Sequence, residues 1–227
     1  MGTLEFNAIA CDRDGTLVKG KTLTDPVRQA IDLFQNAGGT FLLATGETID
    51  QLSEFTDLHR FDLVIAENGA LLYWPRKKCS KLLTTKRSSE VLGTLQVEDI
   101  KAEAIGEVII SAKAAEGEWL RQVVSPYTDW TIVHNRDDVM ALPVGIDKGT
   151  GLAAAVAEFG FATDDVVGIG DGQNDVPLLR AAGVGVTLTS AEVAAKDAAD
   201  VIVDLEPGSA VIEVIDRILS RRLNATR

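Results

Sequence analysis

Two aspartates one residue apart, Asp12 and Asp14, end a short apolar run near the start of the chain. The run 8–11 reads Ala-Ile-Ala-Cys without polar alternation, which is typical of a strand that helices cover on both faces. The two acids therefore follow the carboxyl end of a buried strand, where open α/β sheets bind their ligands. The competing interpretation is an ordinary turn with two solvated acids, and these residues alone do not exclude it.

Further polar residues follow the other strands and begin the helices that this pattern predicts: Thr45, Lys148, Asp171, Asn174 and Asp175. The carboxyl ends of parallel strands meet at one edge of a sheet, so we expect these side chains to converge there. Acids with a purely structural role would instead be scattered over the solvated faces.

Four carboxylates at one edge would repel one another and raise their own pKa values unless a cation offset their charge. Oxygen ligands favour Mg²⁺, and the only two histidines, His59 and His134, have no second histidine at ligand spacing that would suggest zinc. Such an edge suits phosphoryl transfer. A carboxylate can attack phosphorus, a second acid can move the proton, and hydroxyl, amide and ammonium groups can hold the phosphoryl oxygens.

Strands and helices alternate in the sequence around these residues. Thr24 is expected to cap a helix that ends at Gly38, and Gly160 to end the helix that begins at Lys148. Further helices are expected over 48–55, after 175 and from about 209, and strands over 40–44, 62–66, 166–169, 184–186 and 201–203. This order predicts an α/β fold, a Rossmann-like doubly wound parallel sheet.

The alternation is interrupted from residue 75 to residue 143. The interruption predicts a small α+β domain inserted as a cap over 75–143, with the core formed by 1–74 and 144–227. In the cap we expect strands near 107–112, 130–134 and 139–142, and helices near 89–96 and 115–124.

Among the cap residues, Arg136 is the strongest candidate for binding the substrate. It stands in an expected hairpin turn with Asp137 and Asp138, and a cap loop above the site is where substrate would be recognised. Lys113 and His134 are weaker candidates. The basic run between 76 and 87 is either a solvated edge or a region that attracts an anionic substrate.

The chain has 227 residues and a formal net charge of -12, which disfavours nucleic acid as a partner. No apolar stretch approaches the roughly 20 residues of a membrane span, and the start of the sequence lacks a signal-peptide pattern. We therefore expect a cytoplasmic protein with no membrane partner, and the phosphoryl-transfer chemistry of the sheet edge makes a small phosphorylated metabolite the expected partner. The sequence does not indicate an oligomeric state.

Four ordered motifs resemble those of the haloacid dehalogenase (HAD) superfamily of phosphatases. They are 12–16 (Asp-Arg-Asp-Gly-Thr), 44–46 (Ala-Thr-Gly), 147–149 (Asp-Lys-Gly) and 170–175 (Gly-Asp-Gly-Gln-Asn-Asp). The place of the insertion is similar to the Cof-type branch, whose cap is the α/β subclass IIB cap, and the short cap resembles phosphoglycolate and sucrose-phosphate phosphatases. The resemblance implies Mg²⁺-dependent hydrolysis of a phosphoglycolate-type or sugar-phosphate-type substrate through an aspartyl-phosphate intermediate.

The resemblance also implies a role for each matching residue. Asp12 is the nucleophile, Asp14 is the general acid and base, and Thr45 and Lys148 complete the catalytic set. The expected phosphate and substrate ligands are Asp12, Thr45, Gly46, Lys148 and Asn174, with Arg136 from the cap. The expected Mg²⁺ ligands are Asp12, the main-chain oxygen of Asp14, and Asp171, with Asp175 and Asn174 in support.

Two residues depart from the family pattern. Glu47 stands where Cof-type sugar phosphatases usually carry arginine, and Arg13 occupies a position that is more often apolar. Neither departure removes a catalytic group. The alternatives are a phosphomutase or other phosphotransferase on the same scaffold and, from a different class, a non-catalytic phosphate-binding or receiver-like regulator, against which Asp14 and the insertion argue.

Overall fold

The computed structural model describes residues 5–223 except 19, 21 and 94, and its largest element is an eight-stranded sheet. The strand order is β12-β11-β10-β1-β2-β3-β4-β5, and all neighbours from β12 to β3 pair in parallel. The strands are β1 (Ala8–Asp12), β2 (Thr40–Ala44), β3 (Leu63–Ala66), β4 (Leu71–Trp74), β5 (Cys79–Leu82), β10 (Val166–Ile169), β11 (Val184–Leu188) and β12 (Val201–Val203). The predicted doubly wound α/β fold is confirmed.

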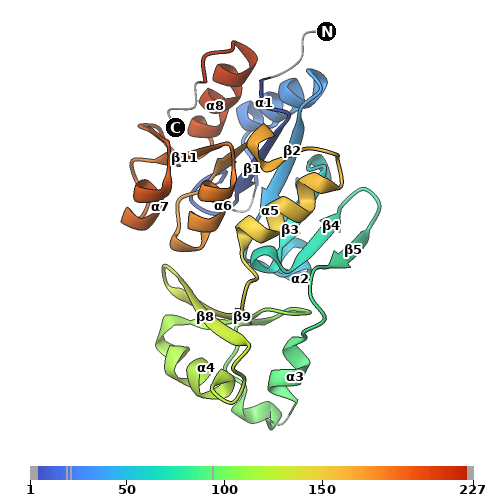
Figure 1. Cartoon of the computed structure of the whole chain (residues 1–227), viewed down its shortest axis with the longest axis vertical. Helices are drawn as coiled ribbons and strands as arrows, with labels where there is room; N and C mark the ends of the chain where they lie inside the picture. The colour runs from blue at the N-terminus through green and yellow to red at the C-terminus, as the bar shows by residue number, and fades with distance from the viewer. Residues whose placement is uncertain (1–4, 19, 21, 94, 224–227) are drawn as a thin grey trace.

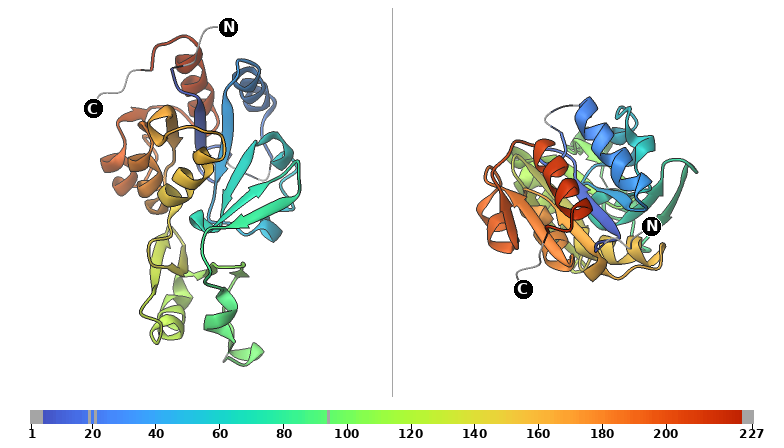
Figure 2. Two further views of the ribbon diagram at one scale, coloured as in Figure 1. Left: turned by 45° about the vertical axis from the view of Figure 1, so that its right-hand side comes forward. Right: turned by 90° about the horizontal axis from the view of Figure 1, so that it is seen from above.

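Alternate side chains of the central strands enter two separate cores. Ile9 and Cys11 pack in the core that contains apolar residues of α1 (Asp25–Asn36) and α8 (Ser209–Leu219), whereas Ala8 and Ala10 face α5 (Lys148–Ala157) and α6 (Val176–Ala181). Figure 1 shows these helices around the sheet, with α7 (Val193–Ala198) beside α6, and the view from above in Figure 2 shows α1 and α8 side by side. Coverage on both faces explains why the run 8–11 is apolar without alternation.

The helix expected over 48–55 is shorter than predicted. In the structure α2 covers Ile49–Leu52, begins with a capping box at Thr48 and gives way to a turn. Phe55 leaves the helical path and packs in the core, with its ring centroid 6.0 Å from that of Phe61. Burial of this ring outweighs continuation of a short helix, which local sequence alone does not reveal.

A second, four-stranded antiparallel sheet forms the centre of the inserted unit. Its order is β6-β7-β9-β8, and its own apolar core includes Leu120 and Trp130. Figure 1 shows this sheet between the main domain and the helices α3 and α4. The elements are α3 (Ser88–Leu92), β6 (Ala104–Ile105), β7 (Ile110–Lys113), α4 (Gly117–Val124), β8 (Trp130–Asn135) and β9 (Asp138–Pro143). The expected helices and strands are present, although α3 ends at Leu92, before the predicted end at 96, and the two-residue strand β6 was not predicted.

The boundary predicted at residue 75 falls inside a hairpin of the main sheet. Strand β5 pairs with β4 from Leu71↔Leu82 to Trp74↔Cys79, so this part of the basic run belongs to the sheet edge. We therefore propose that the cap comprises 83–143, and Figure 2 shows two chain segments that link it to the core. Arg76 and Lys81 form ion pairs with Asp62 and Glu158, at 3.3 and 2.7 Å, as expected for a solvated edge.

Glu67, which follows β3, connects the core to the cap. Its buried carboxylate accepts hydrogen bonds from the backbone N–H groups of Glu107, Val108 and Ile109 at 2.9, 2.8 and 3.0 Å. Gly106 permits this approach, since a Cβ atom there would lie 2.5 Å from the Glu67 carboxyl group. One core carboxylate therefore satisfies three cap amides.

Replacing Glu67 with Gln is expected to lower the free energy of unfolding by about 2 kcal/mol, because hydrogen bonds to a charged acceptor are stronger than neutral ones and the amide NH₂ would face N–H donors. Denaturant unfolding measures the loss, and hydrogen exchange at 107–109 should become faster. The control Glu107→Gln removes a carboxylate that is 63% exposed in the same segment and should change stability by less than about 0.5 kcal/mol. Equal stability of the two variants would contradict this role.

Within the described residues, no helix combines the length and apolar character that crossing a membrane requires.

Candidate active site

The predicted site residues gather at the carboxyl edge of the main sheet, where β1 lies between β10 and β2. Asp12 ends β1, Thr45 follows β2, and Asp171 follows β10. From β1 the chain adds β2 and β3 on one side and returns to add β10, β11 and β12 on the other, so this edge is the topological switch point of the sheet.

Lys148 is fully buried and joins two of the acids. Its Nζ donates to Oδ1 of Asp12 at 2.6 Å and to Oδ1 of Asp175 at 2.5 Å. Burial alone would lower the pKa of Lys148, but the two carboxylates outweigh burial and raise it, so the ammonium group remains charged. A capping box between Asp147 and Thr150 fixes the start of α5 and with it the position of Lys148.

Both oxygens of Asp175 are engaged. Oδ1 accepts from Lys148, and Oδ2 accepts from the backbone N–H groups of Asp171 and Gly172 at 3.0 and 2.9 Å. Asp175 therefore positions both the lysine and the loop that carries Asp171.

Asp171 is held from both the core and the cap. Its Oδ1 accepts from the hydroxyl of Thr16 at 3.0 Å, and its Oδ2 forms an ion pair with Arg136 from the turn between β8 and β9. Gly15, whose φ is +85°, leaves room for this pair, because a Cβ atom there would lie 2.5 Å from Oδ2 of Asp171. The predicted hairpin turn at Arg136 is confirmed, and the side chain of Arg136 reaches Asp171 of the acidic cluster.

The carboxylates of Asp12, Asp171 and Asp175 offer oxygen atoms that all lie within 4.8 Å of one another. Burial raises the pKa of Asp12, the charge of Asp175 raises it further, and Lys148 offsets only part of this effect. Burial also raises the pKa of Asp171. Clustered oxygen donors with this unfavourable mutual repulsion suit a hard divalent cation.

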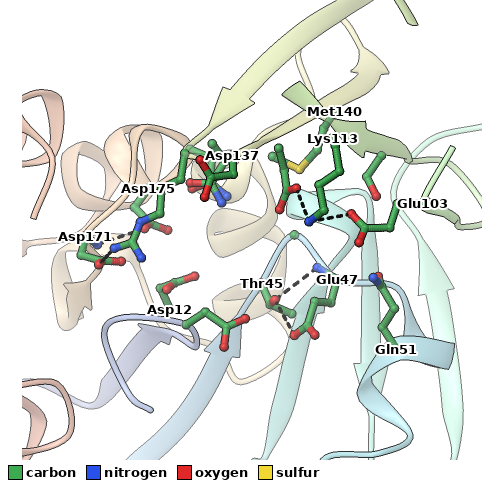
Figure 3. Close-up of a pocket in the computed structure, with 17 residues that line it drawn as sticks. Asp12, Thr45, Glu47, Gln51, Glu103, Lys113, Asp137, Met140, Asp171 and Asp175 are labelled. Atoms are coloured by element: carbon green, nitrogen blue, oxygen red, sulfur yellow. Dashed lines mark hydrogen bonds and ion pairs between the residues drawn. The ribbon is translucent and has the colours of Figure 1, made fainter. Parts of the chain in front are cut away.

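Thr45 lies on the opposite side of the cavity from Asp171, next to Glu47 (Figure 3), and Gly46 also lines the cavity. The hydroxyl of Thr45 donates to Oε2 of Glu47 at 3.2 Å and accepts from the backbone N–H of Glu47 at the same distance. The Asp14 side chain lines the cavity with 60% of its surface exposed, so its carboxylate is accessible from the cavity. Asn174 is buried and donates to the side-chain oxygen of Asn68 at 3.0 Å.

These residues line a cavity of about 260 Å³ between the core and the cap. Five further lining residues were not predicted from the sequence, which are Gln51, Glu103, Ser111, Asn135 and Met140. The sequence contained a signal for Ser111 and Met140. Ser111 and Lys113 on β7, like Asp138 and Met140 on β9, are two residues apart, so each pair lies on one face of its strand. All four residues line the cavity. Lys113, a weaker candidate, lines the cavity, whereas His134 is not among its lining residues.

The chain belongs to the haloacid dehalogenase-like hydrolases, since the model of this family matches residues 9–96 and 72–215. Phosphoglycolate phosphatase 2 of Saccharolobus solfataricus is 28% identical over 93% of this chain and 92% of that protein. A phosphoglycolate phosphatase of Methanopyrus kandleri is 46% identical over 74 residues, which are 33% of this chain and 32% of that protein.

The fold agrees with this assignment. The solved structure of the HAD subclass IIB sugar phosphatase BT4131 superposes with a TM-score of 0.71 at 18% identity, and the match covers 93% of this chain and 98% of that one. The prediction of a HAD-superfamily phosphatase with a Cof-type cap is therefore confirmed.

Proposed function

We propose that this phosphatase hydrolyses a small phosphorylated metabolite in a Mg²⁺-dependent reaction through a phosphate ester of Asp12. The observation that carries the proposal is the position of Lys148, which bonds Asp12 and Asp175 beside Asp171 at the sheet edge where the cavity opens. The cluster combines a carboxylate nucleophile with a fixed positive charge for the phosphoryl group.

Two displacements at phosphorus make up the reaction. An oxygen of Asp12 attacks phosphorus, the ester P–O bond breaks, and Asp14 donates its proton to the leaving oxygen. Asp14 then accepts a proton from water, which attacks phosphorus, breaks its bond to Asp12 and releases inorganic phosphate. Lys148, the hydroxyl of Thr45 and the backbone N–H of Gly46 hold the phosphoryl oxygens during both steps.

The acidic cluster fits Mg²⁺ by the chemistry of its donors, which are all oxygen atoms. Asp12, Asp171 and the main-chain oxygen of Asp14 would hold the ion. Asp175 and Asn174 would support it, since Asp175 bonds Lys148 and the backbone of the loop that carries Asp171. When bound, the ion neutralises carboxylate charge that would otherwise repel a dianionic phosphate.

Chelation of divalent ions is expected to reduce phosphate release at least about 100-fold, and added Mg²⁺ should restore it. Mg²⁺ should also raise the melting temperature of the wild-type protein, since a ligand that binds only the folded state stabilises it. Asp171→Asn should need more Mg²⁺ for the same shift, whereas Asp216→Asn, which removes an exposed acid from α8, should match the wild type. Full turnover in the presence of chelator would contradict the metal role.

The substrate class that we propose is the phosphoglycolate and sugar-phosphate type, supported by the names of the relatives and by the small cavity. A screen of phosphorylated metabolites for phosphate release, in water enriched with ¹⁸O, tests the proposal. Incorporation of ¹⁸O into the released phosphate supports hydrolysis, whereas transfer to a second sugar oxygen would indicate a phosphotransferase. The cytoplasmic location stays a prediction.

A further inference from the structure

The cavity wall away from Lys148 is acidic, and its cations are already paired. The wall contains Asp14, Glu47, Glu103, Asp137 and Asp138, with Lys113 and Arg136 as the cations among the described lining residues. Lys113 Nζ lies 2.9 Å from Glu103 and 2.8 Å from Asp138, and Arg136 pairs with Asp171. Each of these two cations of the described lining residues therefore pairs with at least one carboxylate, and carboxylates outnumber cations in the wall.

Glu47 is the wall carboxylate next to the expected phosphate position, because it accepts a hydrogen bond from Thr45. Its position is fixed by Arg13, whose Nη1 lies 2.7 Å from Oε2 of Glu47. The two side chains are 12% and 20% exposed, and the Arg13 guanidinium lies 5.3 Å from the centroid of the Phe55 ring. The two residues that depart from the family pattern are therefore partners.

The charges of this pair are not placed symmetrically. Glu47 lines the cavity, whereas Arg13 is not among its lining residues and also bonds Oδ1 of Asp14. A substrate in the cavity would therefore meet the carboxylate of Glu47 before the guanidinium behind it. A hydroxyl or ammonium group can donate a hydrogen bond to this carboxylate, but a substrate carboxylate or second phosphate would be repelled.

We propose that Glu47, held by Arg13, selects phosphate monoesters whose far end carries a hydroxyl or ammonium group and rejects those with a second anionic group. This inference rests on the proposed function and narrows its substrate class. It separates this chain from an enzyme for 2-phosphoglycolate, in which one CH₂ group separates the carboxylate from the ester oxygen, although relatives are named phosphoglycolate phosphatase.

Three phosphate esters with the same two-carbon backbone test the selection. The far end is a carboxylate in 2-phosphoglycolate, a hydroxyl in 2-hydroxyethyl phosphate and an ammonium group in O-phosphoethanolamine. We expect kcat/KM for the last two to exceed that for 2-phosphoglycolate by at least about tenfold, since like charges at this range repel strongly in a partly buried site. Equal or faster hydrolysis of 2-phosphoglycolate would overturn the inference.

The generic substrate p-nitrophenyl phosphate separates this inference from the proposed function. If neither p-nitrophenyl phosphate nor any of the three esters is hydrolysed with Mg²⁺, the proposed function fails. If p-nitrophenyl phosphate is hydrolysed and 2-phosphoglycolate is the best of the three esters, hydrolysis stands and the selection by Glu47 fails.

Variants of the pair assign the selection to Glu47. Glu47→Gln should reduce the preference for 2-hydroxyethyl phosphate and O-phosphoethanolamine over 2-phosphoglycolate by roughly tenfold. The double exchange Arg13→Glu with Glu47→Arg keeps an ion pair and should reverse this preference. The control Glu118→Gln removes a carboxylate that is 69% exposed on α4 and should leave the ratio of the three kcat/KM values unchanged. An unchanged ratio in Glu47→Gln would overturn the inference even if the double variant did not fold.

Discussion

Replacement of Asp12 by asparagine is expected to reduce Mg²⁺-dependent hydrolysis of p-nitrophenyl phosphate by at least about 10⁴-fold, because the covalent route loses its nucleophile. The amide has nearly the same shape as the carboxylate, and its oxygen can still accept the hydrogen bond from Lys148. Mass spectrometry of acid-quenched wild-type enzyme should show a phosphoryl group on the peptide that contains Asp12, and this group should be absent from the variant.

Stability distinguishes loss of the nucleophile from loss of the fold. Burial and the charge of Asp175 raise the pKa of Asp12, so its ionised form is costly in the metal-free protein. Asp12→Asn should therefore melt at the same temperature as the metal-free wild type or higher. An exposed acid on the distant helix α8 provides the control, since Asp216→Asn should retain full activity. Turnover by Asp12→Asn close to the wild-type rate would show that another residue attacks phosphorus.

The core of this site could be predicted from sequence because its parts are local. Asp12 and Asp171 each end or follow an apolar run that is buried on both faces, and such runs are visible without tertiary information. By itself, the separation of 136 residues between Asp12 and Lys148 does not show whether the two residues are close in space. The parallel order of the strands predicts that they are close, since that order brings every strand end to the same edge.

The features that sequence did not predict depend on contacts between distant segments. Arg13 and Glu47 each appear alone as an unexpected residue, and only the meeting of two loops 34 positions apart makes them a pair. Glu67 stands after a strand, where a site residue is expected, yet it binds amides of the cap. The edge strand β5 carries exposed polar residues, so its sequence lacks the apolar run that marked the other strands.

Replacement of Lys148 by methionine is expected to lower the free energy of unfolding by about 3–5 kcal/mol, the usual result when one member of a buried ion pair is removed. Asp12 and Asp175 would remain buried without the ammonium group that bonds both. For a chain of this length that loss corresponds to a fall of roughly 10 °C in melting temperature. The control Lys81→Met removes a lysine that is 56% exposed in its pair with Glu158 and should cost less than about 1 kcal/mol.

The pH dependence of the free energy of unfolding tests whether uncompensated carboxylate charge causes the stability loss of Lys148→Met. Burial already raises the pKa of Asp12 in the wild type above its unfolded-state value of about 4, and loss of Lys148 removes a group that lowers it. A carboxyl group with a raised pKa favours the folded state when protonated, so this contribution is present below pH 4 and is lost as pH rises. The deficit of Lys148→Met against the wild type should therefore grow from acid towards pH 8.

Mg²⁺ adds a second test of the same charge balance. An ion held by Asp12 and Asp171 supplies positive charge beside the position that Lys148 vacates, so saturating Mg²⁺ should recover part of the lost stability while activity stays low. Denaturant unfolding at several pH values, with and without Mg²⁺, measures both effects. The stability deficit of Lys148→Met could instead be largest in acid, or Mg²⁺ could increase it. Either result would show that Lys148 stabilises the fold through packing of its aliphatic chain and not by balancing the charge of the two aspartates.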